Sequence, residues 1–334
     1  MVTFSLCMIV KNEEEVLERC LSGIASAMDE IIIVDTGSTD RTKEIARKYT
    51  SKIYDFEWCN DFAKARNFAF SKATGDYIYS ADADEVMDEE NLDKLMKLKQ
   101  VILPEIDIVQ MYYCNQLEMG TTYNFDEEYR PKLFKRLREF LWVDPVHESV
   151  RLEPIVFDSD IRIQHCPLRP HQNRDFAIFK ETLAKGESLS KKLRNMYAKE
   201  LFISGDTADF VAAKEYFQGI AEDENSSMDE IVQASCVVAK AARLTEDVVL
   251  FLKYTLKNFA NDPCAEICCE LGEFYFGQKD YKEAALWFYN AAYETESQLD
   301  IRCNKELPIR GMIRCYEALG DTETAAMYEK ELEK

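Results

Sequence analysis

Two aspartates separated by one residue are the first candidates for chemistry in this chain. Asp82 and Asp84 flank Ala83, and Glu85 follows directly. Two carboxylates so close together repel each other unless a cation or a proton compensates their charge. A hard divalent ion with open coordination positions would do so and would leave room for phosphate oxygens. A solvated acidic turn is the alternative, because the whole chain is rich in Asp and Glu.

Two further residues are suited to binding a nucleoside diphosphate. Asp35 ends the apolar run of residues 30–35, and its carboxylate can accept the imide N–H of a uracil. Arg66 can pair with a diphosphate, and a salt bridge to a neighbouring acid is its structural alternative. After Asp35 a Gly-Ser-Thr turn leads to Asp40, which we expect to be the N-cap of a helix.

Alternating strands and helices are expected to position these residues. Strand, helix, strand, helix in this order implies a parallel sheet with right-handed crossovers. Ligands of such sheets bind beyond the carboxyl ends of the strands, where Asn12, Asp35 and Asp82 fall. The expected strands are residues 4–10, 30–35, 52–56 and 76–80, and the expected helices are residues 13–27, 40–49 and 61–73.

Later segments predict an extension of this sheet and then a second domain. Short strands are expected at residues 106–114, 131–135 and 161–164, where they would form the acceptor side. After these strands the chain has helical spacing throughout. We therefore predict an α/β domain over residues 1–170 and an all-α domain over residues 171–334.

One stretch of the helical part resembles a tetratricopeptide helix pair. Gly272 and Ala284 are small where two helices would cross, and Tyr275 and Phe288 would fill the groove beside them. A generic helical bundle is the alternative, because such patterns of small residues also arise there. In either case several helix pairs must bury their faces together, which predicts one C-terminal domain and makes a homodimer through it plausible.

Charge and hydropathy exclude several classes of protein. The 334 residues carry a formal net charge of -21, which argues against binding to nucleic acid or to anionic membrane surfaces. The N-terminus lacks a basic segment and a small-residue cleavage site, so it predicts a buried strand rather than a signal peptide. No apolar run is long enough to span a bilayer. Together these features predict a cytoplasmic protein.

The 11 cysteines do not resemble a disulfide framework, because most stand singly in apolar stretches. Cys264, Cys268 and Cys269 are grouped at helical spacing. A zinc site is the alternative there, but no paired CxxC repeats follow, and Cys is commonly buried as an apolar residue. We therefore expect buried thiols.

Four segments resemble the ordered motifs of family-two glycosyltransferases with a GT-A fold. They are residues 7–14, 34–40, 65–67 and 82–85, and they match in order and spacing over the first half of the chain. Four motifs in order are far more specific than any one of them. The resemblance implies an inverting transferase that uses a UDP-sugar and a divalent cation, Mn²⁺ or Mg²⁺.

The resemblance also implies roles for residues of the donor site. Asp82 and Asp84 would be the acids of the DxD motif, with Asp84 the main metal ligand. Many relatives carry two adjacent acids where this chain has Asp35 and Thr36, so uracil recognition would depend on one carboxylate. The implied donor-binding residues are Ile9, Val10, Asn12, Glu13, Asp35, Arg66, Asp82 and Ala83.

Two histidines and a glutamate complete the implied site. Residues 130–135 resemble the family's Arg-Leu-Phe strand, and Glu148 beyond it is the candidate base that deprotonates the acceptor. His147 would share this role or orient Glu148, and a surface His-Glu pair is the alternative. His165 ends a strand where similar transferases have a metal-binding histidine, although relatives often continue with Gly-Tyr and this chain with Cys-Pro. Imidazole favours Mn²⁺ over Mg²⁺.

The expected activity is transfer of a hexose or N-acetylhexosamine from a UDP-sugar with inversion. Helical repeats behind such a domain are similar to bacterial transferases that glycosylate Cys or Ser of small peptides, which implies a peptide or protein acceptor. A lipopolysaccharide-core or other glycan acceptor is one alternative, and a non-catalytic interaction protein with a relic transferase domain is another. Nucleotidyl transfer is disfavoured because no Gly-rich, Lys-bearing loop follows the first strand.

Overall fold

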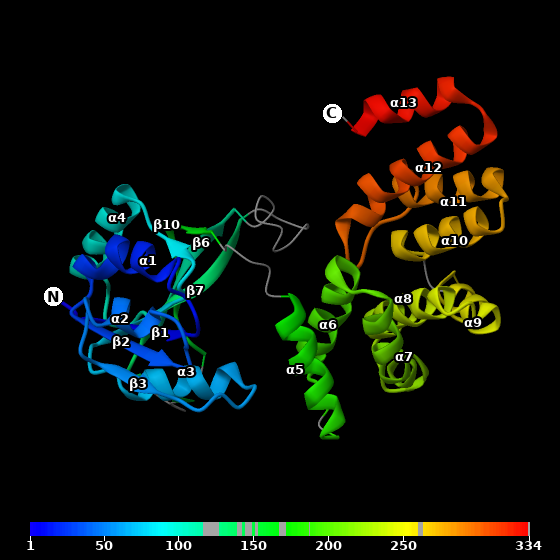
Figure 1. Ribbon diagram of the computed structural model, residues 1–334. Helices are drawn as coiled ribbons and strands as arrows, with labels where there is room; N and C mark the ends of the chain where they lie inside the picture. Colours follow the sequence, from blue (N-terminus) through cyan, green and yellow to red (C-terminus); the bar gives the residue numbers. More distant parts are fainter. Residues whose placement is uncertain are drawn as a thin grey trace. The chain divides into compact units, whose positions relative to one another are not determined.

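The computed structural model describes two compact units, residues 1–170 and 171–334, each with its own hydrophobic core (Figure 1). The residues that it describes are 1–115, 127–138, 142–143, 149–150, 153–166, 172–186, 188–259 and 263–332.

A mixed sheet organises the first unit. Its eight described strands have the order β3-β2-β1-β4-β7-β6-β10-β5. β3, β2, β1 and β4 are parallel, as predicted, and β7 is antiparallel to β4 and β6. The strands are β1 (Phe4–Val10), β2 (Glu30–Asp35), β3 (Ile53–Asp55), β4 (Tyr77–Ala81), β5 (Glu85–Val86), β6 (Ile108–Cys114), β7 (Glu128–Lys135) and β10 (Val156–His165), with β8 (Trp142–Val143) and β9 (Ser149–Val150) in a separate pair.

Helices cover both faces of the parallel strands because alternate side chains of β1 point to opposite sides. Phe4, Leu6 and Met8 belong to a core shared with helices on one face, whereas Cys7 packs in a smaller cluster with Ala69 of α3. The helices are α1 (Leu17–Ile24), α2 (Thr42–Ala46) and α4 (Glu89–Val101) on the first face and α3 (Phe62–Ser71) on the second (Figure 1). Because β2 and β4 run parallel to β1, the carboxyl ends of these three strands meet at one rim.

Some elements differ from the sequence-based expectation. The helix after Asp35 is limited to Thr42–Ala46 and its N-cap is Arg41, so the prediction of Asp40 as the cap is wrong by one residue. Asp40 still binds the helix start, because its Oδ1 accepts a hydrogen bond from the backbone N–H of Thr42 at 3.0 Å. Helix α4 and the short strand β5 were not expected. A two-residue strand is too short to show a period, and few residues of α4 are fully buried.

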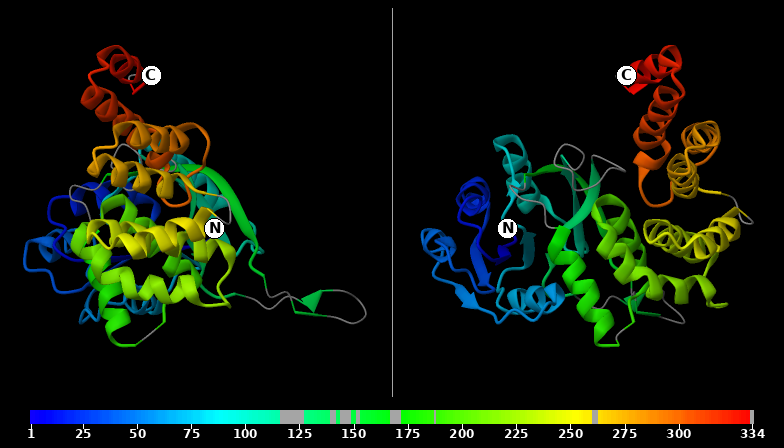
Figure 2. Two further views of the ribbon diagram at one scale, coloured as in Figure 1. Left: turned by 90° about the vertical axis from the view of Figure 1, so that its right-hand side faces the viewer. Right: turned by 45° about the vertical axis from the view of Figure 1, so that its right-hand side comes forward.

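The second unit consists of helices throughout its described part, as predicted. They are α5 (Gln172–Ala184), α6 (Lys191–Ser204), α7 (Thr207–Glu222), α8 (Met228–Leu244), α9 (Val248–Phe259), α10 (Ala265–Gly277), α11 (Tyr281–Tyr293), α12 (Glu306–Leu319) and α13 (Thr322–Leu332), with a short 3₁₀ turn, η2 (Ile301–Asn304), before α12. Most consecutive helices pack against each other as neighbours along the unit, and α6 packs against α8 (Figures 1 and 2).

Local sequence explains where several of these helices begin and end. Asp206 and Asp209 form a capping box at the start of α7, and Ser227 and Glu230 form another at the start of α8. Gly320 ends α12 with a φ of 78°, a left-handed conformation that glycine adopts without a steric penalty.

The packing expected of the tetratricopeptide-like pair is confirmed around Phe288. A Cβ added to Gly272 on α10 would lie 2.6 Å from the Phe288 ring, and one added to Gly311 on α12 would lie 2.7 Å from it. Ala284 and Phe288 are buried in the same cluster, against which Tyr275 packs. Small residues on two helices thus admit one aromatic ring of the helix between them.

All 11 cysteines are free thiols, and nine of them are buried, as expected. Among the described residues, no helix has the length and apolar character needed to cross a membrane.

Candidate functional site

Asp84 and His165 meet at the rim of the sheet although they are 81 residues apart in sequence. The chain leaves β4, turns through residues 82–84 and enters β5, which pairs antiparallel with the end of β10 so that Glu85 stands opposite His165. The backbone N–H of Cys166 donates to the carbonyl of Asp84 at 3.0 Å, which fixes this turn. As a result, His165 Nε2 lies 3.2 Å from Asp84 Oδ2, and both side chains are nearly buried.

The separation of these two atoms suits a shared divalent cation. Neighbouring ligands of an ion bound at about 2.1 Å lie about 3 Å apart, close to the observed 3.2 Å. The His165 ring also packs on Tyr113, with ring centroids 4.9 Å apart. Its Nδ1 is buried without a hydrogen-bond partner, whereas the second nitrogen of a metal-binding histidine usually donates to one.

Asp82, the other acid of the motif, points elsewhere. Arg66 Nη2 lies 3.4 Å from Asp82 Oδ1, and Arg66 also donates to the hydroxyl of Ser80. The salt bridge considered as the alternative for Arg66 is therefore present, and it holds the guanidinium beside the acidic turn. Within the described parts of the chain, Asp82 does not join Asp84 and His165 in a group of potential ligand atoms within 4.8 Å of one another.

A buried ion pair beneath this turn was not expected. Glu85 and Lys132 of β7 contact each other, and both are nearly inaccessible to solvent. Burial raises the pKa of Glu85 to about 7 against the opposing charge of Lys132. Its Oε2 has no hydrogen-bond partner. The sequence offered one signal for this pair: Lys132 directly precedes the apolar residues Leu133 and Phe134 in an expected strand.

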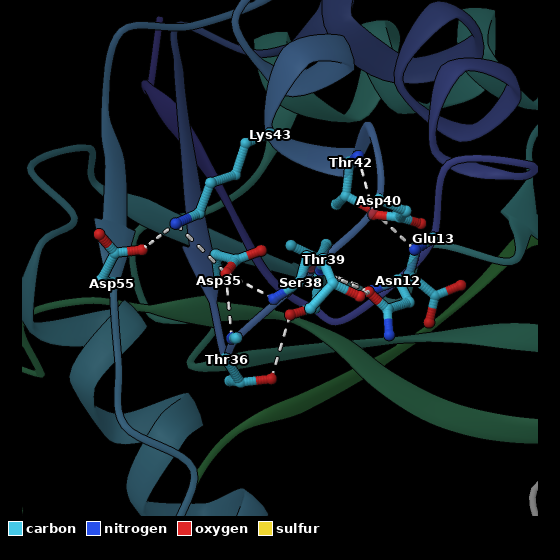
Figure 3. A network of polar contacts seen from close by, with 12 residues as sticks. Asn12, Glu13, Asp35, Thr36, Ser38, Thr39, Asp40, Thr42, Lys43 and Asp55 are labelled. Atoms are coloured by element: carbon cyan, nitrogen blue, oxygen red, sulfur yellow. Dashed lines mark hydrogen bonds and ion pairs between the residues drawn. The ribbon is translucent and has the colours of Figure 1, made fainter.

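Asp35 is the centre of a polar network at the end of β2 (Figure 3). Its Oδ1 accepts hydrogen bonds from the backbone N–H groups of Gly37 and Ser38, each at 3.0 Å, and Lys43 Nζ lies 3.5 Å away. Burial would raise the pKa of Asp35, but the hydrogen bonds from Ser38 and Gly37 and the charge of Lys43 hold it below its ordinary value. Asp35 Oδ2 is buried and has no partner, so one carboxylate oxygen is not used by the chain itself.

The loop after β1 is tied to the turn after β2 (Figure 3). Asn12 has a φ of 57°, its N–H donates to Ser38 Oγ at 2.9 Å, and its Oδ1 accepts from the N–H of Thr39 at 2.8 Å. The N–H of Glu13 donates to Thr42 Oγ1 at 2.7 Å. The two loops therefore form one surface beside Asp35.

The remaining predicted donor-site residues lie close to these groups in sequence. Ile9 and Val10 end β1 opposite Val34 and Asp35, and the carbonyl of Val10 accepts from the N–H of Thr36 at 3.0 Å. Ala83 is buried in the acidic turn. The predicted base Glu148 and its neighbour His147 lie outside the described residues.

Residues 5–150 match the model of glycosyl transferase family 2. The first unit is therefore similar to a glycosyl transferase family 2 domain over these residues. Its mixed sheet followed by a helical region confirms the predicted fold class, a GT-A domain in front of an all-α part.

Individual relatives agree over parts of the chain. A TPR repeat-containing protein of Synechococcus elongatus is 49% identical over 85 residues, which are 25% of this chain and 21% of that protein. The SPbeta prophage-derived glycosyltransferase SunS of Bacillus subtilis (strain 168) is 30% identical over 178 residues, 51% of this chain and 41% of that protein. The chain thus spans less than half the length of these relatives.

A distant likeness links the chain to one solved enzyme. The crystal structure of glucosyl-3-phosphoglycerate synthase from Mycobacterium tuberculosis, in complex with Mn²⁺ and uridine-diphosphate-glucose, has 15% sequence identity and a TM-score of 0.38. It covers 57% of this chain and 81% of that chain. A likeness of this size assigns no ligand to the present protein.

Proposed function

We propose that this protein is an inverting, metal-dependent glycosyltransferase that moves a hexose or N-acetylhexosamine from a UDP-sugar to a peptide or protein. The observation that carries the proposal is the approach of Asp84 Oδ2 to His165 Nε2 at 3.2 Å, at the rim formed by the family-two domain. A solvated acidic turn, the alternative for this motif, would not require a nearly buried histidine from a distant strand.

Asp84 and His165 would hold Mn²⁺ or Mg²⁺, with Asp82 as a further ligand once its side chain turns away from Arg66. The bound cation would neutralise charge that develops on the leaving diphosphate. Arg66 would then be available to the same diphosphate, because a guanidinium binds phosphate oxygens in the same geometry as a carboxylate. The ion pair of Arg66 with Asp82 keeps both groups at the rim until the donor binds.

Asp35 would recognise the uracil through Oδ2, the oxygen that has no partner in the described structure. An imide N–H is a donor, and the depressed pKa of Asp35 keeps the carboxylate an acceptor at neutral pH. Ile9, Val10, Asn12, Glu13 and Ala83 would shape the pocket through backbone positions, which the hydrogen bonds between the two loops support.

The acceptor side rests on the sequence motifs. Glu148 would remove the proton from a Ser or Thr hydroxyl or a Cys thiol while the oxygen or sulfur attacks C1 of the sugar opposite UDP. His147 would orient Glu148 or share its role. A peptide acceptor is supported by the helical second unit and by its tetratricopeptide-like packing around Phe288, since stacked helix pairs present extended surfaces that bind peptides.

The test of the donor reaction is release of UDP by purified protein with Mn²⁺ and a panel of UDP-sugars. We expect UDP release with one or two of the sugars. The rate of UDP release should fall at least about 1,000-fold in Asp84→Asn, since the change removes a charge that acts on the leaving group. Asp93→Asn, which changes an exposed carboxylate on α4, is the matched control and should retain activity. Absence of UDP release and of any thermal shift with every UDP-sugar refutes the proposal.

The test of the acceptor is mass spectrometry of peptides incubated with the active donor. A hexose or N-acetylhexosamine mass added to Ser, Thr or Cys supports the peptide acceptor, and it should disappear in Glu148→Gln. Unchanged peptides alongside a glycosylated saccharide or lipid-linked core would assign the enzyme to a glycan acceptor instead.

A further inference from the structure

Two thiols and a carboxylate converge in the core of the helical unit. Cys236 Sγ of α8 lies 3.3 Å from Sγ of Cys264, the residue before α10, and one atom from each of these residues and from Glu266 lies within 4.8 Å of the others. All three residues are buried. The group differs from the cluster expected from sequence, because it includes a thiol from another helix, Cys236.

Glu266 is fully buried in this core, and no ion pair with a cationic side chain is found for it among the described residues. Its carboxylate accepts hydrogen bonds from the backbone N–H groups of Gln298, Leu299 and Asp300, and Oε1 takes three of these bonds while Oε2 takes one at 3.1 Å. Oε2 therefore retains acceptor capacity. A buried carboxylate of this kind is stabilised further by a bound cation.

An amide oxygen completes the surroundings. Asn258 Oδ1, near the end of α9, lies 3.7 Å from Cys264 Sγ and accepts from the N–H of Cys264 at 3.3 Å. Cys264 is also the N-cap residue of α10. The amide oxygen of Asn258 thus lies beside one thiol of the group formed by Cys236, Cys264 and Glu266.

We propose that Cys236, Cys264 and Glu266 bind a thiophilic divalent cation of the zinc class, with Asn258 Oδ1 as a candidate fourth ligand. Two thiolates bound to one tetrahedral zinc ion at about 2.3 Å lie about 3.8 Å apart, so a shift of a few tenths of an ångström in each sulfur suffices. Each thiol releases its proton to solvent as the metal–sulfur bond forms, and no electron is transferred.

The types of ligand at this site differ from those at the rim of the first unit. The rim offers carboxylates and an imidazole, which suit Mn²⁺ or Mg²⁺, whereas thiolates select softer ions. Because binding displaces protons from the thiols, it should strengthen as pH rises. The bound ion would join α8 and α10 to the segment that leads into η2, and its role would be structural.

The test is titration of the reduced, metal-free full chain with Cd²⁺, followed by competition with Zn²⁺. The expected result is one cadmium–thiolate charge-transfer band that saturates at one ion per chain and disappears when Zn²⁺ replaces Cd²⁺. Cys236→Ser and Cys264→Ser should each lose the band and weaken Zn²⁺ binding by at least about 100-fold. Cys315→Ser, which changes a buried thiol of α12 in another cluster, and Asp84→Asn should keep both.

Melting temperature provides a second measurement. Zn²⁺ should raise the melting temperature of the wild-type chain and of Cys315→Ser, but not that of Cys236→Ser, because only a folded site binds the ion. Absence of the thiolate band in the reduced wild-type chain overturns the proposal whatever the variants do. A band that persists in both Cys236→Ser and Cys264→Ser, or a chain in which these two residues form a disulfide and no metal binds, also overturns it.

Discussion

Buried ionisable side chains at the rim of the sheet are less fully hydrogen-bonded than Glu266 in the core of the helical unit. At the rim, Asp35 Oδ2, Glu85 Oε2 and His165 Nδ1 are buried without hydrogen-bond partners. In the helical core, the carboxylate of Glu266 accepts four hydrogen bonds from three backbone N–H groups. The rim therefore leaves atoms of two acids and a histidine unused, whereas both oxygens of Glu266 accept hydrogen bonds from the backbone. The buried atoms without a partner in the helical unit belong to other groups, namely Arg194, Ser226, Glu230 and Asn304.

This difference separates a ligand site from a structural core. Each unsatisfied buried polar atom costs about 1–3 kcal/mol, and a chain keeps such atoms where function requires them. Substitutions at the rim should therefore change chemistry more than folding. Substitutions in the helical core should change folding more than chemistry. Substitutions in the two regions test this contrast.

Phe288→Ala should have the largest effect on stability and little effect on UDP release. The ring is buried between Gly272 and Gly311, so its removal leaves a cavity. This cavity should lower the free energy of unfolding by about 3–5 kcal/mol. Leu286→Ala, at a half-exposed position of the same helix, is the control and should change stability by less than about 1 kcal/mol. Denaturant unfolding measures both variants, and equal losses would contradict the contrast.

Lys132→Met tests whether the buried ion pair belongs to folding or to chemistry. We expect a loss of about 3 kcal/mol from the first unit, because Glu85 would be left buried without its counter-charge. The double variant Lys132→Met/Glu85→Gln should recover most of the stability, since it removes the unpaired charge. If the double variant is as unstable as the single one, lost packing rather than an unpaired charge explains the loss of stability.

His165→Gln should affect metal use while the fold is maintained. Loss of the imidazole should raise the Mn²⁺ concentration for half-maximal UDP release by about 10–100-fold. The preference for Mn²⁺ over Mg²⁺ should shrink at the same time, because the remaining ligands are oxygens. Cys166→Ser changes the adjacent side chain and should leave the metal dependence as in the wild type. An unchanged Mn²⁺ requirement in His165→Gln would remove His165 from the site.

Glu30→Gln should have the smallest effect, and one that depends on pH. Burial alone would raise the pKa of Glu30, but Lys52, Ser5 and Thr74 together lower it to about 2. This carboxylate therefore stabilises the fold above its unfolded pKa, and that contribution is lost as the pH falls through about 2. We expect Glu30→Gln to cost about 1–2 kcal/mol at pH 7 after solvent screening and nothing near pH 2, as measured by unfolding across pH.

Much of the fold was predictable because its signals are local. The apolar runs at Phe4–Val10 and Glu30–Asp35 gave the first two strands with their observed bounds, and Asp61 was expected to begin the helix that it caps. Strand ends place Asn12, Asp35 and Asp82 at one rim because parallel neighbours share an orientation. The helical spacing of Gly272 and Phe288 likewise predicted the contact that the structure contains.

Local sequence patterns therefore predicted which residues stand at the sheet's rim and that a helical unit follows. Only the tertiary structure decided how distant segments meet: the pairing of β5 with β10 brings His165 to Asp84, and β7 brings Lys132 beneath Glu85. The convergence of Cys236 with Cys264 and Glu266 also depends on the packing of α8 against α10. Periodicity reports the faces of one element, whereas these encounters depend on register and packing between elements far apart in the chain.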